Sequence, residues 1–131
     1  MNLRSMAIDE RMAFLQLARH AIAADGVITQ DEEDRLEDLR REAGMITNEL
    51  PESAPWQKAA TRIQNAQSRR ITFLALCGLL YADYVLDESE SVWIEEVRQL
   101  WALEPAFAKA CLDLMSRQST WRQEANALVL D

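Results

Sequence analysis

The chain has 131 residues, of which 49% are hydrophobic, and a formal net charge of −8. That length predicts one domain with one core, and the acidity argues against nonspecific nucleic-acid binding, which depends on Lys and Arg neutralising phosphates. With only 3 Gly and 3 Pro there is little turn chemistry for an all-β fold. The abundant Ala, Leu, Glu, Arg and Gln favour helices instead, so we expect an all-α protein.

No segment has the roughly 20 consecutive apolar residues that cross a bilayer, and no apolar signal core follows Met1–Ser5. Cys77 and Cys111 lie in apolar helical contexts and form no Cys-x-x-Cys pair. We therefore expect reduced, buried thiols, no membrane insertion and a cytoplasmic protein.

The N-terminal part predicts two helices. The first runs from about Ser5, as its N-cap, to Ala24, and the second runs from Thr29 to Ala43 and is ended by Gly44. Thr29 and Glu32 have the spacing of a capping box, in which each side chain accepts from the other residue's backbone N–H. Apolar residues at helical spacing are expected to face the core: Phe14, Leu17, Ala18, Ala21, Ile22, Leu36, Leu39 and Ala43.

The middle of the chain predicts a loop over Met45–Pro55, a helix from Pro55 to about Ala66, and then the most apolar helix. This last stretch, Ile71–Ala82, is twelve residues without a charge, with Ser68 as its expected N-cap. Because apolar side chains cover every face of such a helix, it belongs in the centre of the fold.

The C-terminal part predicts a helix over Glu88–Trp101, another over Glu104–Ser116, and a last one over Ser119–Asp131, docked by Trp121 and Leu128. The residues expected to be mostly inward are Val92, Trp93, Ile94, Val97, Leu100, Trp101, Phe107, Ala110, Cys111 and Leu114.

An internal duplication appears when the chain is shifted by 58 residues. Ala24–Glu32 then lies over Ala82–Glu90, so that an apolar helix, an acidic loop and a charged helix follow one another twice. A helical hairpin cannot bury its apolar face alone, so two packed copies form the natural unit. Core and charged positions match as well: Ile22 with Leu80, Leu36 with Ile94, Leu39 with Val97, and Arg40 with Arg98.

Both loops imitate only the second half of an EF-hand. With Asp25 at position 5, Gly26 takes position 6 and Glu32 takes position 12, as the calcium loop requires. Positions 1 and 3 are Ala21 and Ala23, which carry no ligand oxygen in their side chains. A true EF-hand is therefore not expected.

The repeated pattern resembles the tellurite-resistance TerB-like proteins. An apolar helix ending in Ala-Asp-Gly, a hydrophobic pair, and a helix opening with Thr/Asp-x-x-Glu carry the resemblance over Phe14–Gly44 and Thr72–Leu103. It implies one domain over residues 1–131, with six to seven helices in two related hairpins around a buried central helix. It also implies an association with stress or chemical-resistance systems. We therefore expect a noncatalytic module of a bacterial stress or tellurite-resistance response, with an unidentified protein partner.

The resemblance further implies an acidic cluster that binds a divalent cation (Ca, Mg or Mn). Carried over by position, its ligands are Asp25, Glu32, Asp83, Asp87 and Glu90. Tyr84 departs from the pattern, since Gly stands there in the first copy. Two other interpretations remain open: the acids serve only as helix caps, or the loops and the charged second helix dock a partner, as in an adaptor.

Other chemistry has little support in the sequence. The single histidine, His20, is expected at the surface or half-buried, and Trp56, Trp93, Trp101 and Trp121 as core and interface anchors. One His and two scattered Cys do not suit zinc, and no phosphate-binding loop, nucleophile elbow or dinucleotide motif is present. We therefore expect no enzyme activity.

Overall fold

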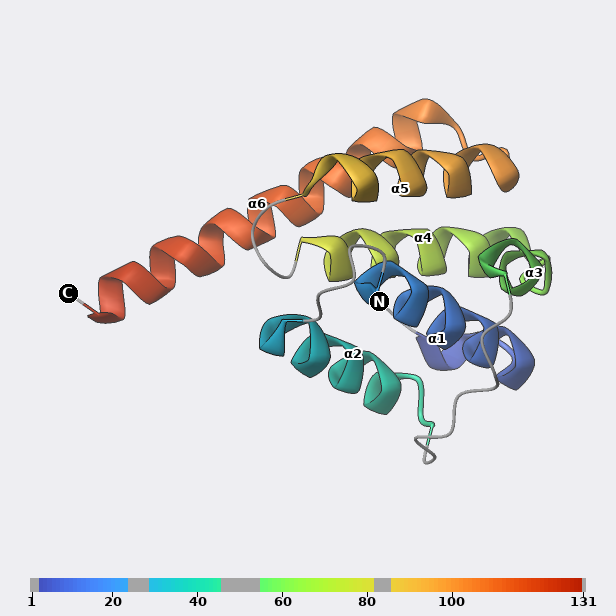
Figure 1. The fold of residues 1–131 in the computed structure, drawn as a ribbon, viewed down its shortest axis with the longest axis horizontal. Coiled ribbons are helices and arrows are strands. Elements are labelled where there is room, and N and C mark those ends of the chain that lie inside the picture. Colours follow the sequence, from blue (N-terminus) through green and yellow to red (C-terminus); the bar gives the residue numbers. More distant parts are fainter. Residues whose placement is uncertain (1–2, 24–28, 46–54, 82–85, 131) are drawn as a thin grey trace.

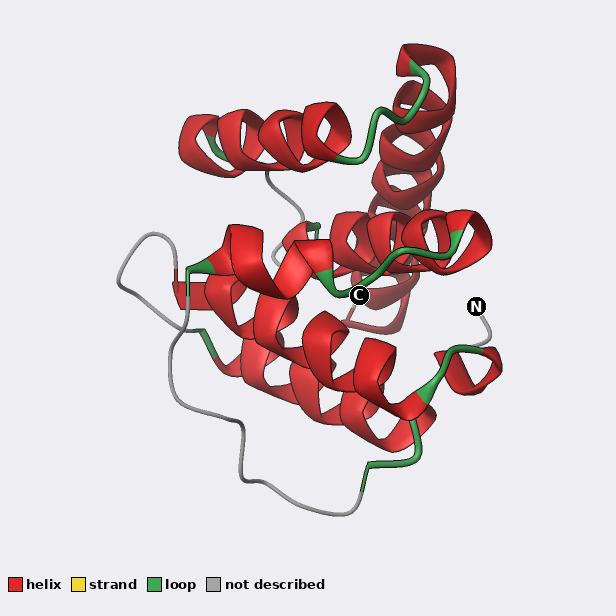
Figure 2. Ribbon diagram, turned by 90° about the vertical axis from the view of Figure 1, so that its right-hand side faces the viewer, coloured by secondary structure: helices red, strands yellow, loops and turns green. Residues whose placement is uncertain are grey.

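The computed structural model describes residues 3–23, 29–45, 55–81 and 86–130. Throughout these residues the regular secondary structure is helical (Figure 2), which confirms the predicted all-α fold. A short 3-10 helix, η1 (Leu3–Ser5), precedes six α-helices: α1 (Ile8–Ala23), α2 (Gln30–Glu42), α3 (Trp56–Thr61), α4 (Ala66–Leu80), α5 (Glu88–Leu100) and α6 (Pro105–Leu130). None of the described helices combines the length and apolarity needed to cross a membrane.

Four helices lie in successive layers in the order α5, α4, α1 and α2 (Figure 1). α3 packs on α1 and α6 packs on α4. From Thr72 to Leu80, α4 is buried at every position except the half-buried Leu74. The predicted buried central helix is therefore confirmed, and its uncharged surface is explained by neighbours on several sides.

The layers contain two hairpins, α1–α2 and α4–α5, whose matching helices are 58 residues apart. In Figure 1 the last turns of α1 and α4 and the first turns of α2 and α5 lie at the same end of the molecule. In both predicted hairpins the end of the first helix and the start of the second thus lie at one common end.

The opposite ends of α2 and α5 also match, through a Schellman motif. Met45 N–H donates to the Arg40 carbonyl at 3.1 Å, and Leu103 N–H donates to the Arg98 carbonyl at 3.0 Å. The residue before each donor has a positive φ: 73° at Gly44 and 51° at Ala102. This left-handed residue closes the helix and satisfies carbonyls that have no partner within it.

Arg40 and Arg98 repeat the same side-chain contacts. Arg40 Nη1 donates to the Met45 carbonyl at 2.6 Å, and Arg98 Nη1 donates to the Leu103 carbonyl at 2.9 Å. Each guanidinium also pairs with a glutamate one turn earlier, Glu37 in the first copy and Glu95 in the second. The matched pair of arginines therefore fixes the chain as it leaves each hairpin.

Two N-terminal arginines hold the end of α2, a role that the sequence did not suggest. Arg11 Nη1 donates to the Ala43 carbonyl at 3.2 Å, and Arg4 Nε donates to the Glu42 carbonyl at 3.2 Å. Arg11 Nη2 also donates to the Arg4 carbonyl at 2.6 Å. Cations at a helix C-terminus are favourable because they face its unpaired carbonyls and negative dipole end.

The predicted N-cap of the central helix is wrong. Asn65 caps α4, because its Oδ1 accepts from the backbone N–H groups of Gln67 and Ser68 at 2.9 and 3.1 Å. Ser68 is buried one turn later, and its hydroxyl donates to Glu10 of α1 at 3.0 Å. Ser68 therefore joins the two central helices instead of starting one of them.

Several predicted boundaries also differ. The chain forms η1 at Ser5 and begins α1 only at Ile8, and α3 ends at Thr61 rather than near Ala66. The predicted break between Ser116 and Ser119 is absent, because no Gly or Pro interrupts α6 there.

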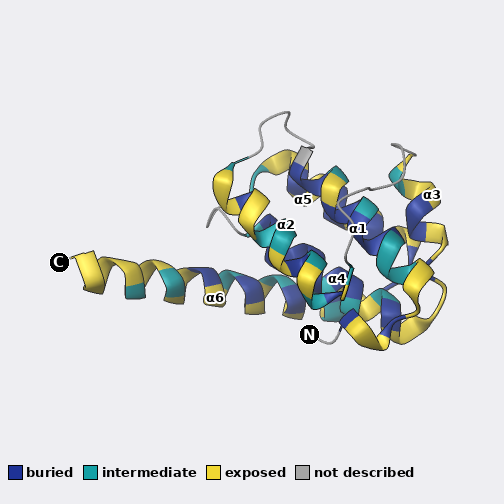
Figure 3. Ribbon diagram, turned by 90° about the horizontal axis from the view of Figure 1, so that it is seen from below, coloured by how far each residue is buried: buried dark blue, intermediate teal, exposed yellow. Residues whose placement is uncertain are grey.

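The C-terminal half of α6 does not dock as predicted. Trp121 is 67% exposed and Leu128 is 79% exposed. Figure 3 shows that the C-terminal half of α6 is mostly exposed. Four residues expected to be inward are also exposed, namely Val92, Leu100, Ala110 and Leu114. The exposed apolar residues of α6 therefore form an outward flank instead of part of the core.

Candidate functional site

Two capping boxes begin α2 and α5. In the first, Glu32 N–H donates to Thr29 Oγ1 and Thr29 N–H donates to Glu32 Oε1, both at 3.1 Å. In the second, Glu90 N–H donates to Asp87 Oδ1 at 2.8 Å, and Asp87 N–H donates to Glu90 Oε1 at 3.3 Å. The first predicted box is confirmed, and Asp87 plays in the second copy the role of Thr29 in the first. We call these four residues the acidic end.

Both glutamates of the acidic end are buried, with only 6% of Glu32 and 9% of Glu90 exposed. Burial, together with the negative charges of Asp87 and Glu32, raises the pKa of Glu90 to about 7, although the hydrogen bond from the Asp87 backbone N–H lowers it. Glu32 is 58 residues away in the sequence, so its influence on Glu90 comes from tertiary proximity. The fold thus brings one carboxylate from each repeat into the same neighbourhood.

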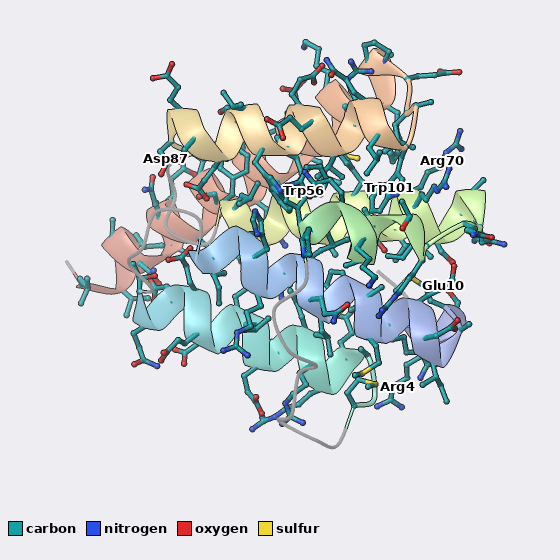
Figure 4. The ribbon with its side chains drawn as sticks, turned by 45° about the vertical axis from the view of Figure 1, so that its right-hand side comes forward. Arg4, Glu10, Trp56, Arg70, Asp87 and Trp101 are labelled. Carbon is teal, nitrogen blue, oxygen red and sulfur yellow. The ribbon has the colours of Figure 1, made fainter. Side chains whose placement is uncertain are left out.

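The pKa of Asp87 is shifted in the opposite direction from that of Glu90. Its pKa is lowered, first by the Glu90 backbone N–H and then by the Ser89 hydroxyl, which donates to Asp87 Oδ1 at 2.8 Å. Figure 4 shows Asp87 at the start of α5. Asp87 is therefore an ionised helix cap held by its own helix, whereas Glu90 titrates near neutral pH.

Asp25 and Asp83, the other two predicted ligands, lie outside the described residues, as do Gly26 and Tyr84. Among the residues that the structure describes, no group of three or more His, Cys, Asp or Glu could hold a metal ion. Ca²⁺ takes six to eight oxygens, so Glu32 and Glu90 would supply only part of a shell. Carboxylate oxygens suit a hard divalent cation, but the described residues supply too few of them to complete its coordination shell.

An aromatic cluster joins α1, α3 and α5. The His20 ring lies 5.3 Å from the Trp93 ring and 6.3 Å from the Trp56 ring, centroid to centroid, and the two indoles meet edge to face at 5.8 Å. Burial lowers the pKa of His20, while the nearby Glu96 raises it. Figure 4 shows Trp56 between α1 and α5, the helices that carry His20 and Trp93. The predicted half-buried histidine and the anchoring roles of these two tryptophans are confirmed.

The two cysteines are buried, as predicted. Burial raises the pKa of the Cys111 thiol to about 11 and raises that of Cys77 further. The thiolate is the reactive form, so both side chains behave as core residues rather than nucleophiles.

No family model, curated protein or solved structure matches the chain. The resemblance to TerB-like proteins therefore stays a prediction.

Proposed function

We propose that the protein is a noncatalytic TerB-like module that binds a divalent cation (Ca²⁺, Mg²⁺ or Mn²⁺) at its acidic end. In this proposal it serves a cytoplasmic bacterial stress or tellurite-resistance response, and the cation joins the two hairpins. The observation that carries the proposal is the pair of buried, electrostatically coupled carboxylates of Glu32 and Glu90, one from each repeat.

Two buried like charges destabilise a fold unless something neutralises them. A proton on Glu90 meets that need at low pH, because burial favours the neutral acid. Above neutral pH a cation between the two glutamates would do the same. Asp25 and Asp83, which adjoin these capping boxes in the sequence, are the proposed further ligands, with water completing the shell.

A melting experiment tests the proposal. Chelator-treated protein is unfolded at pH 8 alone and with CaCl₂, MgCl₂ or MnCl₂. A cation at about 100 times its dissociation constant stabilises the folded state by roughly 2.7 kcal/mol, so the midpoint should rise by several degrees. Glu90→Gln keeps the side-chain shape and an oxygen for the capping box, yet it should abolish most of this rise. Asp25→Asn with Asp83→Asn should do the same.

The matched control is Glu104→Gln, which removes one carboxylate from an exposed position outside the acidic end. This variant should respond to the cation like the wild type. Equal responses in Glu90→Gln and the wild type, or no response to any of the three cations, would remove the cation from the proposal.

A second candidate is an adaptor whose acidic loops are purely structural. It is favoured by the capping boxes, which give Glu32 and Glu90 a sufficient role in the fold. The exposed side chains of Glu33, Asp34 and Asp38 on α2 would then face a basic partner. Charge reversal with Glu33→Lys and Asp38→Lys should abolish capture of such a partner while leaving the melting curve of the protein unchanged.

A further inference from the structure

The exposed flank of α6 has the spacing of a coiled-coil seam. Leu114, Trp121 and Leu128 are seven residues apart, and all three are exposed, Leu114 by 46%. Gln118 and Ala125 lie between them, which gives the alternating steps of four and three residues of heptad positions a and d. Phe107, half-buried, continues the same row toward the body of the protein.

This seam is separate from the face with which α6 packs on the body. The buried residues of α6 are Ala108, Cys111, Met115 and Ser119. At 100° per residue they point about a third of a turn away from the row through Leu114, Trp121 and Leu128. α6 can therefore keep its contacts with α4 and still offer the seam to another helix.

The distal part of α6 needs support that the described body does not provide. In Figures 1 and 3 the helix runs well past the rest of the fold, after Arg122 has reached the Tyr81 carbonyl at the end of α4 (3.5 Å). Leu128, Val129 and Leu130 follow, and all three are exposed. A helical end without tertiary packing is marginal in water, so an apolar partner should cover it.

The charged residues beside the seam indicate which partner helix fits and in which orientation. Arg117 and Glu124 both occupy heptad position g, and neither forms an ion pair within the described residues. In an antiparallel pair of identical helices g faces g, so Arg117 meets Glu124 of the other copy, and this happens twice. In a parallel pair g faces e, and Arg117 would meet Arg122, a like charge.

We propose that α6 pairs antiparallel with α6 of a second copy of this chain. In this register Trp121 packs beside Gln118 of the other copy, and Leu114 beside Ala125. The bodies then lie at opposite ends of the pair, which separates two chains that each carry a net charge of −8. The contact is self-complementary about a twofold axis, so it closes at a dimer and does not continue into a fibre.

Sedimentation equilibrium of the full chain tests the proposal, with and without 1 mM EDTA so that it stands apart from cation binding. The mass should rise with concentration from 15.0 kDa toward twice that value in both buffers. Trp121→Glu with Leu128→Glu should keep the protein monomeric. Gln123→Glu, which adds the same charge at the outward position f, should leave the dimer unchanged.

Charge exchange tests the orientation. Arg117→Glu and Glu124→Arg should each weaken the dimer roughly tenfold, since each creates two like-charge contacts. Mixing the two single variants, or combining both changes in one chain, should restore the wild-type affinity. A monomer at every concentration up to about 1 mM would overturn the proposal. So would a dimer that survives Trp121→Glu with Leu128→Glu, or one that ignores the charge exchange.

Discussion

The hairpin α1–α2 closes on Gly44, whereas the hairpin α4–α5 closes on Ala102 in the same left-handed conformation. The surrounding hydrogen bonds from Met45, Leu103 and the two arginines join the same groups in both hairpins. Gly adopts a positive φ freely, while Ala costs roughly 1–2 kcal/mol there. The closing geometry is thus kept even where the residue does not suit it, which shows that the hairpin and not the single residue sets the backbone.

The acidic ends of the two hairpins differ in charge. Thr29 caps α2 with a neutral hydroxyl, whereas Asp87 caps α5 with a carboxylate beside Glu90. The N-cap of α5 therefore carries a negative charge, whereas the N-cap of α2 is neutral. The charge of Asp87 is one reason why the pKa of Glu90 is raised. The difference leaves Glu90, and not Glu32, with a carboxylate as its capping-box partner.

The largest effect should come from the core position that the hairpins share. Leu39 and Val97 are equivalent and both are 0% exposed. Leu39→Ala should lower the free energy of unfolding by about 2–5 kcal/mol, and Val97→Ala by roughly 1–3 kcal/mol because it removes fewer carbons. Urea denaturation measures both. Val92→Ala, at an exposed position of α5, should stay within about 0.5 kcal/mol of the wild type. An equally small loss in Leu39→Ala would contradict the shared core.

The next effect is a pH dependence that belongs to the second hairpin. Glu90 has a pKa of about 7 in the fold and 4.5 when unperturbed, so the folded state binds more protons between these values. Its contribution to stability is present below pH 4.5 and is lost as pH rises through 7, with a slope of at most about 1.4 kcal/mol per pH unit.

Glu90→Gln should remove this loss of folding stability with rising pH and leave the variant more stable than the wild type at pH 8 in EDTA. His20 acts oppositely, because its lowered pKa makes the fold more stable as pH rises toward 6.5. Since His20 is present in both proteins, the difference between their urea curves isolates Glu90. Parallel pH profiles for the two proteins would refute the assignment.

The smallest effect compares the two closing residues directly. Ala102→Gly should raise the free energy of unfolding by about 0.5–1 kcal/mol by relieving the positive φ, and Gly44→Ala should lower it by roughly 1–2 kcal/mol. Ala110→Gly, in an exposed turn of α6, should instead destabilise by about 1 kcal/mol, as glycine does inside a helix. If Ala102→Gly also destabilised, the left-handed closure at Ala102 would be wrong.

Local sequence signals predicted much of the fold. The Thr29–Glu32 capping box, the apolar stripe of α1 and the uncharged surface of α4 each depend on residues within one or two turns. The sequence was misleading where a polar residue had a tertiary role. Ser68 looks like a cap, but it is buried and bonded to Glu10, which is 58 residues away.

The site and the C-terminal helix were harder to predict. Neither the burial of Glu32 and Glu90 nor their coupling follows from capping-box spacing, because both depend on how the hairpins pack. Trp121 and Leu128 suggested docking to the body, since large apolar side chains are usually covered. Their seven-residue spacing with Leu114 places all three on one face of α6, but the buried Ala108 and Met115 have the same spacing, so it does not tell an exposed face from a covered one.

The central claim is that the two hairpins bring one buried carboxylate each to a common end of the molecule. Carboxyl ¹³C NMR titration of Glu90 in wild-type protein and in Glu32→Gln, both in EDTA, measures this directly. We predict a midpoint near 7 in the wild type and a lower one in the variant, with most of the shift remaining because burial is its main cause. A Glu90 midpoint near 4.5, unmoved by Glu32→Gln, would contradict the claim and remove the basis for the proposed cation site.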